Sequence, residues 1–451
     1  PPIQSPYLIH LELLFKSLIP DTGQNMFPTN IIIINQACLL DIFCNSESFC
    51  SISLRPVRQK KVTVLKIKYF IGKKGALLLI APDPRVGMTA YQKALLNFLK
   101  VAPNNGVPTL SGANILVVQI AGMGDFTLAT PAIRALRHAN PSGKLDLLTS
   151  VKGKRAADGC PFIDSIDTLD FLDASQTVGI SSFRLLNIIS KIFEIRKHRY
   201  DIAINMMGLY SSKGAVRMGL FLRSLGTPLL AGRNTLGTGC FYQHAIQENL
   251  ASPQNERDTH LSLIRHLGVE SEDNGELKIW PNEEDEQSAQ TILAGTKTKG
   301  PLIMVNPGSD RPEKNWPKEQ FLQVMFALRE TRGAKFLLAG GPAEAQLCSH
   351  IASALSSDAF NTVGKISYQG TASLMKKCDL VITSDTAALH LAWAADIPGV
   401  ALFKKENLGR YRPATGKISC LTGNEDKNMG ILNIRPDEVL KVCLEKIDMA
   451  S

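Results

Sequence analysis

One carboxylate stands out by its place in the chain, because Asp125 follows a glycine-rich turn that ends a short apolar run. The run at 115–118 is typical of a parallel strand buried on both faces. Thr130 followed by Pro131 predicts the start of a helix soon afterwards. Ligands of open α/β sheets bind at the carboxyl ends of such strands. Asp125 is therefore either a helix-capping aspartate or a general base that points into a cleft.

A nicotinamide dinucleotide site is disfavoured at this turn, although its glycine pair resembles the dinucleotide fingerprint. The third glycine of that fingerprint is replaced by Thr127. In addition, the carboxylate of Asp125 would repel a pyrophosphate at the helix N-terminus, where anions are otherwise stabilised.

A second group of polar residues follows strand-like segments in the C-terminal half. In the stretch NPGSDRPEKNW, Ser309 comes directly after a glycine, and Lys314 lies in the loop before the next helix. Backbone N–H groups, a hydroxyl and a compact positive charge are together suited to binding phosphate. The alternative is a surface loop with a solvated lysine.

Two later turns extend this group. Glu344 follows the glycine pair of LAGGPAEAQ, where a carboxylate either accepts ribose hydroxyls or complements a helix dipole. In ITSDTAALHLAWAA, Asp385 and Thr386 end a strand, and the N–H groups of Thr386 and Ala387 are placed to hold phosphate. His390 lies among apolar residues, so a packed core histidine competes with a ligand-binding one.

Composition excludes several classes of protein. The 451 residues are 44% hydrophobic and 20% charged, as in a globular protein of two or three domains. No apolar run approaches the length of a transmembrane helix. The N-terminal residues do not resemble a signal peptide, and the nine cysteines are scattered without zinc-site spacing. We therefore expect a cytoplasmic protein with reduced thiols.

The charge distribution also limits the partners that we expect. Much of the net charge of +9 lies in the first 80 residues, and the remainder is nearly balanced. This balance argues against a dedicated nucleic-acid surface.

The pattern along the chain predicts an α/β fold of two Rossmann-like domains that face each other across a cleft. Strand-like and helix-like segments alternate from residue 114 in two sets. We assign 88–280 to a first Rossmann-like domain, 281–300 to a linker region and 301–451 to a second Rossmann-like domain. Residues 1–87 show no pattern to which chemistry can be assigned. The open alternatives are an accessory region, a basic membrane-surface patch, or translated sequence upstream of a natural start at Met88, which we slightly favour.

Six blocks, taken in order, resemble the bacterial glycosyltransferase family 9, typified by ADP-heptose:lipopolysaccharide heptosyltransferases. The resemblance covers about residues 114–445, and the blocks read VVQIAGMGDFTLATPAIRALRHANP, GCPFIDSI, YDIAINMMGL, VNPGSDRPEKNWP, LLAGGPAEA and VITSDTAALHLAWAADIPGVALF. The resemblance implies the GT-B fold, with the acceptor on the first domain and the donor on the second. It also implies inversion at the anomeric carbon, no bound metal, and no cofactor besides a nucleotide-sugar co-substrate such as ADP-heptose.

The resemblance also assigns roles to single residues. Asp125 aligns with the family's catalytic carboxylate, which would remove the proton of the acceptor hydroxyl. Lys314 matches the phosphate-binding lysine, and Ser309 matches the hydroxyl of the same loop. The block near the donor is matched by Asp385, Thr386 and His390.

The chain departs from the family pattern at two places. Ala387 replaces a glycine of the donor block. After the last strand the sequence FKKENLGRYRP replaces a shorter glycine-containing loop, which places Lys404 and Lys405 near the expected pyrophosphate. These departures leave the identity of the sugar and of the nucleotide open.

On the acceptor side, a basic group that consists of Lys152, Lys154 and Arg155 follows a strand of the first domain. It is placed to hold an anionic acceptor, such as a phosphorylated glycolipid of the cell envelope, or else it is a solvated loop. We expect peripheral contact with the cytoplasmic face of the inner membrane as one option. Two other functions stay open: a nucleotide-sugar epimerase or hydrolase, and a catalytically idle sugar-nucleotide binder or scaffold.

Overall fold

A computed structural model describes most of the chain beyond residue 95, together with four strands before it. The described residues are 38–46, 49–56, 65–72, 75–81, 96–104, 106–169, 182–270, 274–296, 298–309, 311–423 and 430–450. The chain divides into two compact units, Pro1–Phe98 and Leu99–Ser451. Met88, the residue of the expected alternative start, lies outside the described residues.

The first unit contains an antiparallel sheet that the sequence pattern did not predict. Its four described strands pair in chain order, with an irregularity between Cys44 and Ser46. The strands are β1 (Cys38–Ser46), β2 (Phe49–Pro56), β3 (Leu65–Gly72) and β4 (Gly75–Ala81).

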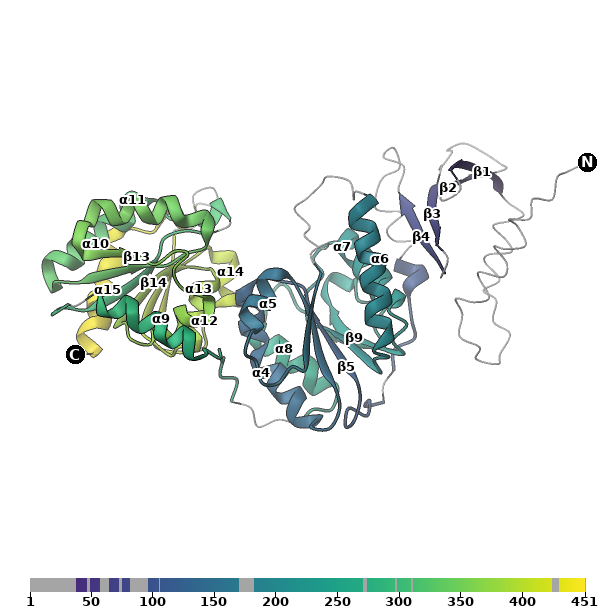
Figure 1. Ribbon diagram of the computed structural model, residues 1–451, viewed down its shortest axis with the longest axis horizontal. Helices are drawn as coiled ribbons and strands as arrows, with labels where there is room; N and C mark the ends of the chain where they lie inside the picture. The colour runs from purple at the N-terminus through teal and green to yellow at the C-terminus, as the bar shows by residue number, and fades with distance from the viewer. Residues whose placement is uncertain are drawn as a thin grey trace, which may run out of the picture. The chain divides into compact units, whose positions relative to one another are not determined.

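The second unit is built on two parallel sheets, each with six strands among the described residues (Figure 1). We call them, with the helices that cover them, the first and second lobes. In spatial order the first sheet consists of β10 (His244–Gln247), β9 (Leu229–Asn234), β8 (Ile202–Asn205), β5 (Ile115–Gln119), β6 (Leu145–Thr149) and β7 (Ser165–Thr168). The second consists of β13 (Ala359–Asn361), β12 (Lys335–Leu338), β11 (Leu302–Asn306), β14 (Leu380–Ser384), β15 (Gly399–Phe403) and β16 (Ile418–Thr422).

Helices cover both faces of each sheet, as parallel strands joined by crossovers require. The first lobe has α4 (Met123–Ala139), α5 (Val151–Ala157), α6 (Ser182–Lys197), α7 (Ser212–Ser224), α8 (Glu256–His266) and the short η1 (Thr235–Gly237). The second has α9 (Glu283–Ala294), α10 (Lys318–Arg332), α11 (Ala345–Leu355), α12 (Tyr368–Met375), α13 (Ala387–Ala394), α14 (Lys405–Tyr411) and α15 (Pro436–Ala450). Its short helical turns are η2 (Pro312–Lys314), η3 (Pro342–Glu344), η4 (Ser356–Asp358) and η5 (Gly430–Asn433).

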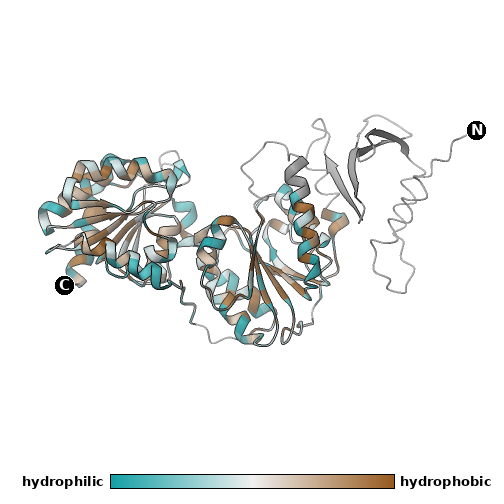
Figure 2. Ribbon diagram, in the orientation of Figure 1, coloured by the Kyte–Doolittle hydropathy of each residue, from teal (hydrophilic) through white to brown (hydrophobic). Residues whose placement is uncertain are grey.

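The central strands form the apolar core of each lobe, and Figure 2 shows them as the most hydrophobic part of each lobe. All five residues of β5, β6, β11, β14 and β15 are buried. The predicted α/β class and the two alternating sets are therefore confirmed. The predicted apolar face of the helix at 317–332 is also confirmed, because α10 buries Phe321, Val324, Met325 and Leu328.

The predicted start of the first helix is wrong. Helix α4 begins at Met123, with Gly122 as its N-cap, so Pro131 lies inside the helix instead of at its first position. A proline inside a helix leaves the carbonyl four residues earlier without its usual donor. That carbonyl belongs to Thr127, and the hydroxyl of Thr130 donates to it at 2.7 Å. The side chain that we expected to cap the helix therefore compensates for the proline within it.

The expected linker region at 281–300 contains helix α9, which packs against α12 of the second lobe. Asp285 of α9 accepts a hydrogen bond from Ser367, and Glu286 accepts one from Ser373 at 2.7 Å. The acidic first turn of α9 is thus both a favourable helix N-terminus and a contact surface.

Candidate active site between the two lobes

Asp125 lies in the first turn of α4, and one of its oxygens caps that helix. Its Oδ2 accepts a hydrogen bond from the backbone N–H of Gly122 at 3.0 Å. Burial, followed by the negative charge of Glu256, raises the pKa of Asp125 to about 6, against the lowering effects of the Gly122 N–H, Lys314 and Arg311. The two interpretations of this residue are therefore compatible: the cap fixes the carboxyl group, and burial gives it the proton affinity of a base at neutral pH.

The N-terminus of α4 touches the second lobe at a glycine. A Cβ atom at Gly124 would lie 2.7 Å from Cδ2 of His390 and 3.2 Å from Cα of Ala387, both on α13. Only glycine allows this approach without displacement of a neighbour. The first turn of α4, which carries Asp125, therefore lies directly against α13.

In the second lobe, the structure brings Lys314 and Asp385 together. The Nζ of Lys314 donates to Oδ2 of Asp385 at 2.6 Å and to its backbone oxygen at 2.9 Å. The same Oδ2 accepts a hydrogen bond from Asn407 at 2.8 Å, and Lys314 lies over the ring of Tyr411, 5.8 Å from its centre. The side chain of Lys314 is 15% exposed and that of Asp385 is 4% exposed. Lys314 is thus a paired and mostly buried cation, not a solvated loop lysine.

Helix α13 presents the other predicted donor residues. Thr386 is its N-cap, and the Thr386 hydroxyl donates to Oδ1 of Asn306 at 3.2 Å. His390 is 5% exposed, and its Nδ1 has no hydrogen-bond partner among the described residues. Burial lowers the pKa of His390 to about 4, so the ring is neutral at neutral pH. His390 is therefore buried, as the core alternative predicted, but at the contact between the lobes.

Ser309 and Glu344 make local contacts beside this group. The hydroxyl of Ser309 accepts a hydrogen bond from the Arg311 N–H at 2.9 Å. Glu344 Oε2 accepts one from the Gly341 N–H at 2.6 Å, and the Glu344 side chain packs over Gly308. The capping interpretation of Glu344 therefore has a visible contact, and ribose binding by Glu344 stays a prediction.

The basic group Lys152, Lys154 and Arg155 lies on helix α5, not in a loop, and all three side chains are exposed. The backbone oxygen of Arg155 accepts a hydrogen bond from Gln369 of the second lobe at 2.6 Å. Lys404 is the N-cap of α14, and Lys405 is its first residue.

The family-model comparison matches residues 189–432, more than half of the chain, to glycosyltransferase family 9 (heptosyltransferase). This chain belongs to glycosyltransferase family 9. It is similar to lipopolysaccharide heptosyltransferase 3 of Escherichia coli K12, with 24% identity over 72% of this chain and 95% of the relative. It is also similar to lipopolysaccharide heptosyltransferase 2 of Salmonella typhimurium, with 22% identity over 72% and 96% of the two chains. The recognised family and the glycosyltransferase activity are confirmed.

Two solved structures support the fold of this family 9 member. A family 9 glycosyl transferase from Veillonella parvula has 22% identity and a TM-score of 0.63, over 76% of this chain and 99% of that one. The E. coli ADP-heptose lps heptosyltransferase II has 17% identity and a TM-score of 0.60, over 74% and 99%. The predicted GT-B architecture is therefore confirmed.

A buried charged cluster next to Asp125 lies outside every motif recognised in the sequence of this glycosyltransferase. Arg233 is the penultimate residue of strand β9 and is fully buried, and it donates to both Glu248 and Glu256. A charged residue at the end of an otherwise apolar strand was the available signal, because arginine is rarely buried without partners. Glu248 and Glu256 follow Arg233 by 15 and 23 residues and share no motif with it.

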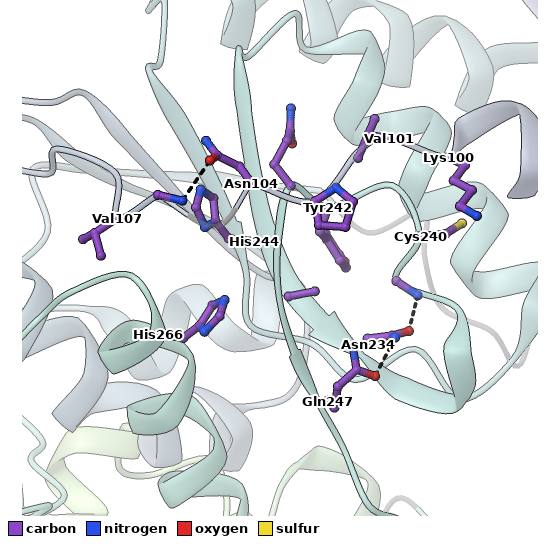
Figure 3. Close-up of a pocket in the computed structure, with 15 residues that line it drawn as sticks. Lys100, Val101, Asn104, Val107, Asn234, Cys240, Tyr242, His244, Gln247 and His266 are labelled. Atoms are coloured by element: carbon purple, nitrogen blue, oxygen red, sulfur yellow. Dashed lines mark hydrogen bonds between the residues drawn. The ribbon is translucent and has the colours of Figure 1, made fainter.

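A separate hollow of about 330 Å³ lies at the β10 edge of the first sheet (Figure 3). Lys100, Asn104, His244 and His266 are among its lining residues, and none of the predicted site residues is. Burial lowers the pKa of His244, with a smaller contribution from His266. We assign the family's chemistry to the contact between the lobes and not to this hollow.

Among the described residues, no group of three or more His, Cys, Asp or Glu side chains is arranged to hold a metal ion. Four aspartates recur every three residues from Asp164 to Asp173, which is not the spacing of a D-x-D metal motif. Asp164 and Asp167 each pair with a basic residue, and Asp170 and Asp173 lie outside the described residues. No helix in the described part of the chain is long and apolar enough to cross a membrane.

Proposed function

We propose that this family 9 enzyme is an inverting, metal-independent heptosyltransferase. Its donor is a nucleotide-diphosphate sugar, with ADP-heptose as the first candidate, and its acceptor is an anionic glycan of the lipopolysaccharide core or a related envelope glycolipid. The names of the curated relatives support the sugar and the acceptor class, since the similarity extends over 72% of this chain and nearly the full length of those relatives.

The observation that carries the proposal is the placement of Asp125 against the second lobe. Its carboxyl group is held by the Gly122 N–H, and burial raises its pKa to about 6. Such a group is deprotonated at neutral pH and still has appreciable affinity for a proton, as a general base requires. Lys314 of the second lobe is close enough to act electrostatically on Asp125.

In the proposed reaction, the acceptor hydroxyl oxygen forms a bond to the anomeric carbon of the donor. Asp125 takes the hydroxyl proton while the bond between the anomeric carbon and the diphosphate oxygen breaks. The electron pair of that bond leaves with the nucleoside diphosphate. Because the attack comes from the face opposite the leaving group, the configuration at the anomeric carbon is inverted.

The leaving diphosphate gains negative charge and needs donors instead of a base. Lys314 supplies positive charge, and Ser309 supplies a hydroxyl. The first backbone N–H groups of α13 supply donors at the N-terminus of that helix. Thr386 and Ala387 begin α13, and Glu344 is proposed to accept a ribose hydroxyl of the donor.

The acceptor is proposed to approach α5 of the first lobe. Exposed Lys152, Lys154 and Arg155 would attract phosphate or carboxylate groups of the acceptor at long range. The same basic surface would favour loose contact with an anionic membrane face, because cationic side chains near such a surface are attracted to it.

The deciding experiment is mass-spectrometric detection of transfer by the intact chain and by Asp125→Asn. Both are incubated with a panel of nucleotide sugars that includes ADP-heptose, with delipidated and intact lipopolysaccharide-core acceptors, with and without EDTA. We expect transfer by the intact chain alone, insensitivity to EDTA, and an inverted anomeric configuration in the product. Donor binding without transfer by either protein would favour the scaffold function. Equal transfer by both proteins would exclude Asp125 as the base.

A further inference from the structure

A buried ion cluster links the two lobes beside Asp125. Its centre is Glu256, the first residue of α8, which is 6% exposed. Arg233 donates to both carboxylate oxygens of Glu256 and to the backbone oxygen of Met206. Burial alone would raise the pKa of Glu256, but Arg233 and, less strongly, Arg410 hold it below its ordinary value. Glu256 is therefore a fixed negative charge.

The second lobe contributes a cation to the same carboxylate. Nε of Arg410, on α14, lies 3.9 Å from Oε2 of Glu256, and the side chain is 15% exposed. The Arg410 guanidinium also lies over the ring of Tyr210, 4.4 Å from its centre, which is favourable for a cation. Tyr210 packs over Gly208, where a Cβ atom would lie 2.3 Å from the Tyr210 hydroxyl oxygen. Arg410 therefore contacts both the Glu256 carboxylate and the Tyr210 ring of the first lobe.

Neighbours of Arg410 make contact with the same stretch of the first lobe. Gly409 packs against Pro253, where a Cβ atom would lie 3.0 Å from Cγ of the proline. The side-chain amide of Asn255 donates to the backbone oxygen of Arg412 at 2.6 Å. Three nearby positions of one lobe therefore contact residues 253–256 of the other.

The opposite side of α14 faces the donor residues. Tyr411 lies under Lys314, and its ring centre is 6.1 Å from that of His390. Asn407 donates to Asp385, the partner of Lys314. Movement of α14 would therefore change the surroundings of Lys314 and His390 together.

We propose that Glu256 and Arg410 are positioning residues of the transferase, and that their ion pair holds α14 against the first lobe so that Lys314 and Tyr411 stand beside Asp125. The proposal rests on the proposed function, because it assigns Asp125 and Lys314 their roles in transfer. Arg233 holds Glu256 within the first lobe, so the carboxylate has one fixed orientation in which Arg410 can pair with it. The segment FKKENLGRYRP, which departs from the family pattern, would thus serve to dock α14 against the first lobe.

This arrangement also balances charge around the base. Glu248 and Glu256 place two negative charges near Arg233, which neutralises one of them. Arg410 supplies the second positive charge when α14 is docked. Loss of Arg410 would leave the negative charge of Glu256 without its second cation near Asp125. It would also remove the ion pair that joins α14 to the first lobe.

The test combines backbone amide exchange with transfer kinetics on the full chain. Arg410→Gln keeps a polar side chain without the charge, and Arg410→Lys restores the charge. The matched control is Arg332→Gln, which removes an exposed ion pair with Asp448 elsewhere in the second lobe. Exchange is followed by mass spectrometry in peptides that contain residues 405–412 and 253–257, and transfer is followed with ADP-heptose.

We expect faster exchange in both peptides for Arg410→Gln, and wild-type exchange for Arg332→Gln. The kcat of Arg410→Gln should fall about 10-fold to 100-fold, since misplacement of reacting groups by about 1 Å has effects of that size. The affinity of Arg410→Gln for ADP should change less than about threefold, and Arg410→Lys should recover much of kcat. A uniform rise in KM with unchanged kcat would indicate simple donor binding by Arg410 and overturn the positioning role.

Unchanged exchange in Arg410→Gln would overturn the proposal, whatever the kinetics. If exchange changes as expected but the intact chain transfers no sugar, the proposed function fails. In that case the contact between Glu256 and Arg410 stands and its role in transfer is rejected.

Discussion

The two lobes surround their principal charged residues, Asp125 in the first and Lys314 in the second, in different ways. In the first lobe, burial and the negative charge of Glu256 make the anionic form of Asp125 unfavourable, so the carboxylate readily accepts a proton. In the second lobe, Lys314 already has a full counter-ion in Asp385, at 2.6 Å. A base must gain a proton during transfer, whereas a phosphate-binding lysine must keep its charge and exchange one anionic partner for another. The difference in surroundings therefore matches a difference in chemical task.

The largest effect is expected when the base is removed and the helix cap is kept. Asn in place of Asp125 retains an oxygen that can accept the Gly122 N–H, so the fold should persist. We expect Asp125→Asn to lower kcat by at least about 1000-fold, within the range that general bases contribute. Single-turnover transfer assays with saturating donor measure this loss directly.

Asp285→Asn is the matched control, because Asp285 occupies the same position of α9 and caps it through the backbone N–H of Asn282 at 3.0 Å. Its transfer rate should stay within about twofold of the wild type. A comparable loss in both variants would mean that Asp125 serves only as a helix cap.

The second test concerns Lys314 and the carboxylate that holds it. Lys314→Gln should weaken ADP binding about 10-fold to 100-fold and destabilise the fold by about 3 kcal/mol, since Asp385 would be left buried without its cation. The double variant Lys314→Gln with Asp385→Asn should regain stability but not ADP affinity. Calorimetric titration and thermal unfolding separate the two effects. Recovered ADP affinity in the double variant would contradict phosphate binding by Lys314.

Gly124→Ala tests the contact between the lobes itself. The added methyl group would lie 2.7 Å from the ring of His390, so α4 and α13 would have to separate slightly. We expect kcat to fall about 10-fold, with little change in the unfolding temperature because alanine favours a helix. The additional substitution His390→Ala should relieve the clash. If Gly124→Ala alone transfers sugar normally, the lobes do not close at this point during catalysis.

The pH dependence of transfer tests the same difference between the lobes, because Glu256 of the first lobe raises the pKa of Asp125 and Lys314 of the second lobe lowers it. The base works deprotonated, so kcat/KM should fall as the pH drops through about 6. Glu256→Gln removes a charge that raises this pKa and should move the acidic limb to lower pH. Lys314→Gln removes a charge that lowers the pKa and should move the limb to higher pH. We expect shifts of about 0.5 to 1 unit.

The other charged group that acts on Asp125 is Arg311, which stays unchanged in both variants. Tyr368 and Tyr411 also face the carboxyl group, but burial raises the pKa of both far above the range of the experiment. His390 has a pKa of about 4 and remains neutral. Shifts in the same direction for both variants would contradict the proposed electrostatics.

The smallest effect is expected on the acceptor side. Joint replacement of Lys152, Lys154 and Arg155 by Gln should raise the acceptor KM about threefold at low salt and hardly at all at high salt, because exposed charges are screened. Donor KM should not change. An acceptor KM that is insensitive to this replacement at low salt would place the acceptor elsewhere.

Much of the fold could be predicted, because buried parallel strands and amphipathic helices have strong local patterns. The apolar face of α10 and the run of β5 are examples. The start of α4 could not be predicted by the same rules, because its cap is Gly122 and its proline is accommodated by the Thr130 hydroxyl. Local preferences pointed to Pro131, but two contacts within the helix, from the Gly122 N–H to Asp125 and from the Thr130 hydroxyl to Thr127, allow the earlier start.

The candidate site was only partly accessible from sequence. Asp125 and Lys314 could be found from turns and from a family resemblance. The pairing of Lys314 with Asp385 joins residues far apart in the chain, and Arg233, Glu256 and Arg410 lie in no recognisable motif. Contacts of that kind depend on how separate segments pack within a lobe and, for Glu256 with Arg410, on how the two lobes meet. A pattern within one segment carries no such information.

Thr130 also connects helix α4 to the segment that leads to the second lobe. Its hydroxyl oxygen accepts a hydrogen bond from the Lys278 N–H at 3.2 Å, and Arg134 donates to the backbone oxygen of Glu276 at 3.0 Å. The chain that crosses to the second lobe is therefore fastened to α4, the helix whose first turn bears Asp125. At about 3.6 residues per turn, Thr130 lies less than two turns from the base and Arg134 about two and a half turns from it. A swing of the second lobe would pivot close to Asp125, so that a wide excursion at the lobe's far rim would translate into only a slight displacement at the reacting atoms.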